Sequence, residues 1–290
     1  MKRAIGIIVG LIALHVALSL WPGGQAPKAD WLADGPPVLV MAHGAGQGIG
    51  PHTTLEAAML SAAAGADVIE LDVHLTADGH LVVNHDATVE ATTNGSGAVD
   101  EMTLEEIQAF DAGTAFREAS GAASFAGRGV VVPTLEAIFE ALPQAGYLIE
   151  IKPEAPGTDR ALCDLLRKYA LQARVMVGSF HLTALERFRE LCPEVATSMA
   201  ESEVETLVYL HKIGLANLAP LNGSALQMPL EAAGIRILTR SLIKAAHGRG
   251  LAVHAWTIND PEVMERLIGL GIDGLITDYP ERALKVLGRK

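Results

Sequence analysis

The sequence predicts an α/β protein, most simply a TIM-type (β/α)8 barrel, because short apolar runs alternate with amphipathic segments along most of the chain. Such a barrel needs about 250 residues, and the chain has 290. A doubly wound sheet produces a similar alternation, so the periodicity favours the barrel but leaves the sheet open. The expected strands are 38–43, 68–73, 147–152, 174–179, 194–199, one within 215–228, 251–256 and 274–277, and the expected helices are 54–64, 159–169, 182–191, 203–212, 240–249 and 261–270.

An apolar helix is expected before the barrel. Lys2 and Arg3 precede an uncharged run at 4–21, and a helix of that length extends about 27 Å, close to the thickness of a bilayer core. We expect a membrane anchor whose basic end stays in the cytoplasm, which places the main domain outside the cytoplasm. A cleaved signal peptide, and hence a secreted protein, is the alternative. The expected parts are residues 1–22 (anchor or signal segment), 23–37 (linker) and 38–290 (barrel domain).

Composition narrows the possible functions. The net charge is −12, whereas a nucleic-acid-binding protein needs a basic face, so that class is disfavoured. An acidic protein that handles phosphates needs a cation to mediate, which favours a metal. The two cysteines, Cys163 and Cys192, both fall in expected helices and have no zinc-site spacing. We therefore expect two buried thiols.

One segment departs from the alternation of strands and helices. The apolar stretches 68–75 and 80–85 are joined only by four residues that include Asp78-Gly79, which is too short for a helical crossover and typical of an antiparallel hairpin. A two-residue loop would place Asp72 opposite His85, on the same side as Glu70.

Two strands carry pairs of charged residues at alternate positions. Glu70 and Asp72 project to one face of an apolar strand, and Glu150 and Lys152 do the same on another. Two inward acids repel each other unless a cation lies between them, and carboxylates favour Ca²⁺ or Mg²⁺. The alternatives are a solvated edge strand for the first pair and a strand-end salt bridge for the second.

Histidines follow two of the expected strands, His43 after the first and His85 after the hairpin. Imidazole transfers protons near neutral pH, so two histidines near paired acids favour acid–base chemistry. The glycine-rich stretch 44–50 does not fit a dinucleotide loop, because Ile49 occupies the third glycine position. Ser179 is not in a G-x-S-x-G elbow, which disfavours a serine hydrolase.

Several of these segments together resemble the glycerophosphodiester phosphodiesterase family. The similarity extends from about residue 38 to the C-terminus and is clearest at 41–43, 65–73, 76–86, 149–153, 253–260 and 273–280. The resemblance implies a TIM-type barrel with an extra hairpin that hydrolyses glycerophosphodiesters to glycerol 3-phosphate and an alcohol. Some members of such families act on lysophospholipids instead. The implied site residues are Glu70, Asp72 and Glu150 as ligands of a divalent cation (Ca²⁺ or Mg²⁺), His43 and His85 as the acid–base pair, and Lys152, Trp256 and Gln227 as contacts to the substrate.

Two motifs depart from the family pattern. Where the family usually has His-Arg-Gly, this chain has His43-Gly44-Ala45, and where it usually has Pro-Glu-Asn-Thr, His52 replaces the glutamate. If that arginine and glutamate pair with each other, losing both leaves no buried charge behind. The departure implies altered substrate preference or slower turnover, with His52 in a replacement role at the substrate. A catalytically degenerate, membrane-tethered binding protein is the alternative function.

Overall fold

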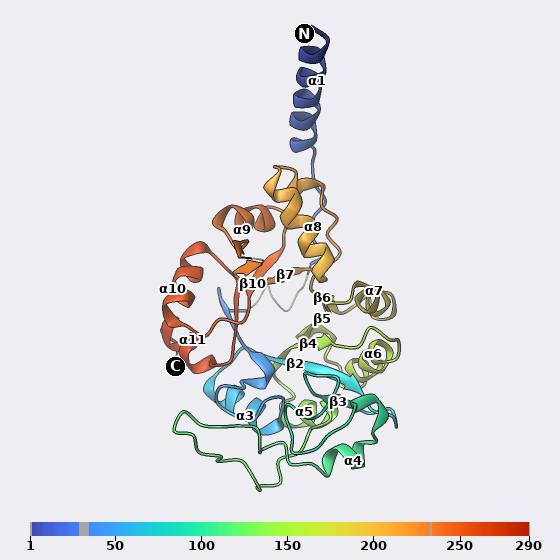
Figure 1. Ribbon diagram of the computed structural model, residues 1–290, viewed down its shortest axis with the longest axis vertical. Helices are drawn as coiled ribbons and strands as arrows, with labels where there is room; N and C mark the ends of the chain where they lie inside the picture. Colours follow the sequence, from blue (N-terminus) through green and yellow to red (C-terminus); the bar gives the residue numbers. More distant parts are fainter. Residues whose placement is uncertain (1, 29–34, 233, 290) are drawn as a thin grey trace.

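Eight parallel strands form the centre of the molecule, and helices surround them (Figure 1). The strands pair in the order β6-β5-β4-β2-β1-β11-β10-β7, and a bridge between Ser198 and Ala225 links the two end strands, so the barrel is nearly closed. This computed structural model describes residues 2–28, 35–232 and 234–289. The predicted barrel is confirmed, with strands β1 (Leu39–Ala42), β2 (Val68–Leu75), β4 (Gly146–Ile151), β5 (Val175–Gly178), β6 (Ala196–Thr197), β7 (Ala225–Met228), β10 (Ala252–Ala255) and β11 (Gly274–Thr277).

Helices cover the outside of the barrel and begin at capping residues that the sequence supplies. Thr54 accepts a hydrogen bond from the Ala57 N–H, and Asp260 caps a helix whose first residue is Pro261. Their apolar faces pack on the outward side chains of the strands in two large clusters. The helices are α3 (Leu55–Ala64), α5 (Leu135–Ala141), α6 (Thr158–Lys168), α7 (Leu182–Leu191), α8 (Glu201–Lys212), α9 (Arg240–His247), α10 (Pro261–Leu270) and α11 (Pro280–Val286).

Inside the barrel, a small apolar layer fills the part nearer the amino ends of the strands. Its buried members come from alternate strand positions, as the two-residue period of a strand requires. The residues that follow on the same inward face, two positions closer to the carboxyl ends of the strands, include acids and histidines. The buried members of this layer are Leu39, Met41, Val68, Leu148, Met176, Ala225 and Ile276.

The predicted hairpin is present, but the predicted register is wrong by one residue. β3 (Leu81–Val83) pairs antiparallel with β2 so that Leu75 lies opposite Leu81. The Thr76 N–H donates to the His80 carbonyl at 2.9 Å, so the loop between this pair holds three residues, 77–79, rather than two. A two-residue Asp-Gly turn needs a positive φ at both residues, and here Gly79 has one (86°) but Asp78 does not. Asp72 consequently lies beside Asn84, whose N–H donates to the Asp72 carbonyl at 3.0 Å, and not opposite His85.

Two segments depart from the alternation of strands and helices in the barrel. Between β3 and α5, the short helices η2 (Val99–Glu101) and α4 (Leu104–Gln108) enclose a small separate core with Val82 and Ile107 at its centre. A second hairpin, β8 (Glu231–Ala232) with β9 (Ile235–Arg236), follows β7 and has its four strand residues exposed. The remaining short helices are η1 (His43–Ala45), η3 (Gln172–Arg174) and η4 (Ala216–Leu218).

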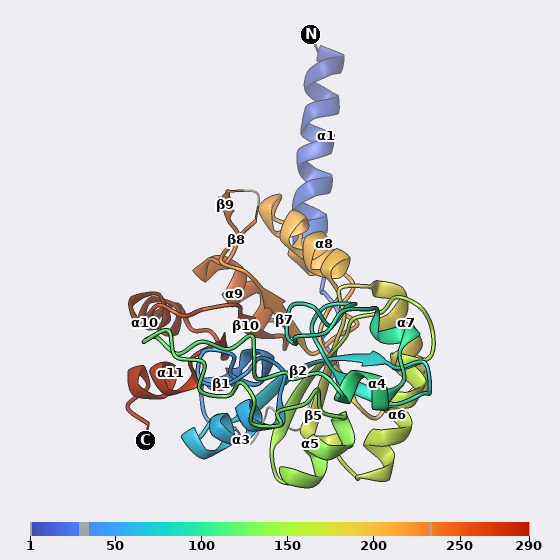
Figure 2. The same cartoon turned by 60° about the horizontal axis from the view of Figure 1, so that its bottom comes forward.

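The N-terminal helix α1 (Lys2–Ser19) projects away from the barrel (Figure 2). Its last turn is fastened to η4, because the Asn217 side chain donates to the carbonyls of Leu18 at 2.8 Å and Trp21 at 2.7 Å. Among the described residues, no helix is long and apolar enough to cross a membrane, so the predicted anchor at 1–22 is not supported. Part of the predicted linker, residues 29–34, lies outside the described residues.

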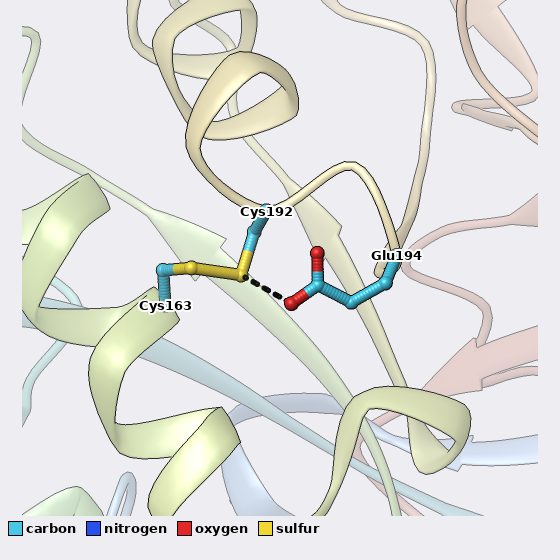
Figure 3. Close-up of side chains that lie close together, drawn as sticks. All are labelled: Cys163, Cys192 and Glu194. Atoms are coloured by element: carbon cyan, nitrogen blue, oxygen red, sulfur yellow. Dashed lines mark hydrogen bonds between the residues drawn. A yellow bond between two sulfur atoms is a disulfide. The ribbon is translucent and has the colours of Figure 1, made fainter.

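Both cysteines are buried, as predicted, but the expectation of two free thiols is wrong. Cys163 in α6 and Cys192, directly after α7, form a disulfide with 5.8 Å between their Cα atoms (Figure 3). The pairing depends on how two neighbouring helices pack, which their sequence spacing does not reveal. The Glu194 carboxylate lies 3.8 Å from the Cys192 sulfur. Oxidised sulfurs offer no thiolate to a metal, so these three residues are not a metal site.

Candidate active site

The carboxyl ends of the strands bring the predicted site residues together. His43 follows the inward residue Met41 by two positions, and Glu150 follows the inward residue Leu148 in the same way. In a barrel of parallel strands these ends open on one face, where functional groups from distant parts of the sequence meet. The inward faces thus change from apolar to polar as the strands reach this end.

Three of the predicted residues, Glu70, Asp72 and Glu150, form a compact acidic cluster. Each offers a carboxylate oxygen, and these oxygens all lie within 4.8 Å of one another. Asp72 and Glu150 are adjacent because β2 and β4 pair in parallel with these two residues in register. Glu70 and Asp72 are almost wholly buried. The cluster therefore gathers negative charge inside the barrel, where water screens it poorly.

The electrostatics of this cluster favour a cation. Burial, and then the charge of Asp72, raise the pKa of Glu70 to about 8, and the same two causes raise the pKa of Glu150. Lys152 partly offsets the charge, with its Nζ 3.2 Å from Asp72 Oδ1 and 3.2 Å from Glu150 Oε1. Burial alone would lower the pKa of Lys152, but the two carboxylates raise it.

The donor set fits a hard divalent cation. The cluster contains only carboxylates, which Ca²⁺ and Mg²⁺ prefer. Asp72 Oδ2 is buried and has no hydrogen-bond partner among the described residues, and a buried carboxylate oxygen is costly unless something binds it. A divalent cation held by these carboxylates would satisfy that oxygen and balance the repulsion between the acids.

His43 is held by an acid that the sequence analysis did not single out. Its Nδ1 lies 2.6 Å from Asp278 Oδ1, and Gln47 and Asn259 donate to the same carboxylate at 2.8 Å and 2.6 Å. Burial would lower the pKa of His43, but the hydrogen bond to Asp278 and the charges of Glu70, Asp278 and Asp72 outweigh it and raise the pKa to about 9. Asp278 follows the inward Ile276 by two positions, as His43 follows Met41, and this spacing was the available signal.

His52 lies near both of the predicted acid–base histidines. Its ring centroid is 6.4 Å from that of His43 and 5.8 Å from that of His85. Burial lowers the pKa of His52 to about 4, so its ring is neutral near pH 7. His85 is more exposed, and its Nδ1 lies 2.7 Å from Asp86. His85 thus reaches the site, although it does not lie opposite Asp72 in the hairpin.

Gly44 connects His52 with the acidic cluster. Its N–H donates to Glu70 Oε2 at 2.6 Å, and a methyl group built on its Cα would overlap the His52 ring. Gly44 has φ of 51°, a left-handed conformation that glycine adopts readily. The absence of a side chain at Gly44 is therefore what allows His52 to pack there.

The other two predicted substrate contacts lie in β7 and directly after β10. Gln227 in β7 extends toward β5, because its Oε1 would be 3.4 Å from a Cβ built on Gly178. Trp256 follows β10 and packs edge-on against Phe180, with 5.9 Å between the ring centroids. Phe180 is 46% exposed, so the two rings form a partly open aromatic surface.

Comparison with known proteins agrees with this architecture. Residues 43–282 match the model of the glycerophosphoryl diester phosphodiesterase family. A glycerophosphodiester phosphodiesterase from Caldanaerobacter subterraneus is 33% identical over 258 residues, which cover 86% of this chain and 97% of that protein.

Solved structures share the fold. The crystal structure of glycerophosphodiester phosphodiesterase from Agrobacterium tumefaciens is 26% identical and aligns with a TM-score of 0.69 over 86% of this chain and 99% of its own. An Oleispira antarctica phosphodiesterase, solved with the product sn-glycerol-3-phosphate, is 23% identical with a TM-score of 0.68, over 86% of this chain and 96% of its own. Because the family model spans most of the chain and a full-length relative shares a third of its residues, the chain belongs to the glycerophosphoryl diester phosphodiesterase family.

Proposed function

We propose that this enzyme hydrolyses glycerophosphodiesters to glycerol 3-phosphate and an alcohol, with a divalent cation at the acidic cluster and with histidines as acid and base. The observation that carries the proposal is the convergence of Glu70, Asp72 and Glu150 within 4.8 Å, at the barrel end that also holds His43. Family membership supports the reaction, and the geometry supports the roles of the residues.

Glu70, Asp72 and Glu150 hold the cation, which is Ca²⁺ or Mg²⁺. When bound, it supplies positive charge that polarises the phosphate and stabilises the charge that develops on its oxygens. Lys152, whose ammonium group lies 3.2 Å from two of these acids, is close enough to approach a phosphate held beside them. We assign Trp256, Gln227 and His52 to the remaining sides of the substrate pocket.

His43 and His85 move the protons. The nucleophile is a water or the neighbouring hydroxyl of the glycerol, and it loses a proton to one histidine while the other protonates the leaving oxygen. Attack by water gives glycerol 3-phosphate directly, whereas attack by the hydroxyl gives a cyclic phosphate that a water opens in a second step. The pKa of His43 near 9 favours its protonated ring, which supports the donor role in the first step. Asp278 holds that ring at 2.6 Å and so fixes its orientation.

Product analysis tests the proposal directly. Purified protein is incubated with glycerophosphocholine, glycerophosphoethanolamine or a lysophospholipid, in EDTA and then with Ca²⁺ or Mg²⁺ added. We expect glycerol 3-phosphate and the free alcohol, and only with metal present. Equal turnover in EDTA would rule out the metal role. Tight metal binding without any hydrolysis would favour the degenerate binding protein.

A lysophospholipase D activity is the second candidate, and the aromatic surface of Trp256 and Phe180 favours it. An exposed phenyl ring at a pocket gives an acyl chain an apolar contact that a glycerophosphodiester does not need. Phe180→Ala should then lower kcat/KM for lysophosphatidylcholine more than for glycerophosphocholine. Equal losses on both substrates would remove this candidate.

We also propose that the barrel functions in an oxidising compartment outside the cytoplasm. The Cys163–Cys192 disulfide supports this location, since such bonds persist mainly in oxidising compartments. The basic residues Lys2 and Arg3 ahead of an apolar stretch are typical of an export segment. Fractionation of cells that express the full chain, with thiol labelling of each fraction, tests the location. Recovery of reduced protein from the cytoplasm alone would contradict it.

A further inference from the structure

His52 and Gly44 form a matched pair at the centre of the site. The His52 ring fills the space that any side chain at Gly44 would need, and the Gly44 N–H is already bonded to Glu70. A substitution at one of these positions therefore changes what fits at the other. The pair also stands at the two positions where the chain departs from the arginine and glutamate of the motifs that it resembles.

The position of His52 places it beside a bound phosphate. A phosphate whose proton transfers involve His43 and His85 has to lie between them, and the His52 ring lies 6.4 Å from one and 5.8 Å from the other. The Nε2 edge of the His52 ring faces Gly44, and Nε2 is shielded there. Nδ1, on the opposite side of the ring, makes no hydrogen bond with the described residues, so it is the ring nitrogen that can bond to a ligand.

We propose that His52, packed over Gly44, is a specificity-determining residue: a hydrogen-bonding wall of the phosphate pocket that favours the singly charged diester over the doubly charged monoester product. This inference rests on the proposed function. A guanidinium group in the same place would attract the second charge of a monoester and retain it. An uncharged imidazole donates one hydrogen bond to a phosphate of either charge. It therefore adds no extra affinity for the doubly charged product, which leaves more readily.

The test compares product affinity and turnover in metal-loaded, full-length protein. Isothermal titration with sn-glycerol 3-phosphate gives the product dissociation constant, and glycerophosphocholine hydrolysis gives kcat and KM. The variants are Gly44→Arg, His52→Glu and their combination. We expect the double variant to bind glycerol 3-phosphate about tenfold to a hundredfold more tightly than wild type, as one charge-assisted bidentate contact allows. Each single variant should be less active than the double variant, because each leaves a clash or an unpaired buried charge.

Two further variants keep the test decisive if the double variant does not fold. His52→Ala should lower kcat/KM about tenfold to a hundredfold through loss of a hydrogen bond to a charged group. His52→Gln, which retains a neutral donor, should stay within about threefold of wild type by the same argument. His80→Ala, which removes an exposed histidine of the hairpin, is the control and should match wild type.

The outcomes separate this inference from the proposed function. Wild-type activity together with unchanged kinetics in His52→Ala would overturn the role of His52. Equal product affinity in the wild type and in a folded double variant would overturn the selection by charge. A wild-type protein that hydrolyses no glycerophosphodiester would refute the proposed function itself, whatever the His52 variants do.

Discussion

The site has two halves, and the buried charge of each half is balanced in a different way. The acid half consists of Glu70, Asp72 and Glu150, whose carboxylate oxygens lie within 4.8 Å of one another, and Lys152 lies 3.2 Å from two of them and offsets part of their charge. The histidine half consists of His43, His52 and His85 with Asp278, and it carries its own ion pair at 2.6 Å. The acid half therefore favours a cation from outside, whereas the histidine half contains an ion pair of its own.

The two halves also differ in how the chain builds them. The acids stand on β2 and β4, which pair in parallel, with Asp72 in register with Glu150. The histidines stand in segments that follow strands, and His43 meets its partner Asp278 across 235 residues of sequence. The acid half is thus fixed by a sheet, and the histidine half by loops and by pairing of the first strand with the last. Loss of the metal and loss of a histidine should consequently have separable effects.

The largest effect is expected in the acid half. Glu70→Gln and Asp72→Asn should each lower kcat/KM by about a thousandfold or more, because charge stabilisation by a metal contributes several kcal/mol. The same variants should lose the rise in Tm that Ca²⁺ or Mg²⁺ gives the wild type, a stabilisation of about 2.7 kcal/mol at a hundred times Kd. Thermal unfolding with each metal and with EDTA measures this. An unchanged metal response in a folded Glu70→Gln variant would contradict the assignment.

His43→Ala tests whether the halves are separate. Loss of one acid–base group lowers kcat by about a hundredfold to ten-thousandfold, while the three carboxylates remain in place. We therefore expect low turnover together with a normal rise in Tm on adding metal. Near-normal turnover in the folded variant would sink the catalytic assignment, and a lost metal response would show that the halves act as one.

The disulfide offers a comparison with a region outside both halves. Cys163 and Cys192 join α6 to the end of α7 and close a segment with a sequence separation of 29. The chain-entropy argument then gives a loss of about 3–4 kcal/mol in the free energy of unfolding for the Cys163→Ala/Cys192→Ala double variant. Urea unfolding measures it. Turnover and the metal response at 25 °C should stay unchanged, and a fall in either would mean that the bond also supports the site.

The same contrast explains what the sequence could and could not predict. Glu70, Asp72 and Glu150 were found because alternate positions of an apolar strand share a face, a rule that needs no knowledge of the fold. The hairpin register was missed by one residue because Asp78 does not take the positive φ that a two-residue turn requires, and the loop is one residue longer.

Contacts between segments that lie far apart in the chain could not be predicted from the sequence. The pairing of Asp278 with His43 needs β1 beside β11, and the disulfide needs α6 packed against α7. The His52 ring lies where a side chain on Gly44 would be, and this depends on the path of the loop between the two residues. Such contacts appear only when the whole barrel is assembled.

Asp278→Asn gives the smallest and most specific effect. The variant keeps the shape of the side chain but removes the charge that raises the pKa of His43. The pKa of His43 should fall by about one unit or more. The limb of the pH–rate profile that belongs to His43 then moves to lower pH, whether that residue acts as acid or as base. A fall of about tenfold to a hundredfold in kcat/KM should accompany the shift.

The matched control for that shift is Asp86→Asn, which alters the exposed pair with His85. Water screens an exposed pair, so this variant should move the profile much less than Asp278→Asn does. The length of the pairs would not explain a difference between the variants, since it is nearly the same, 2.6 Å and 2.7 Å. Equal shifts in both variants would mean that the His43–Asp278 pair is as well screened as a surface pair.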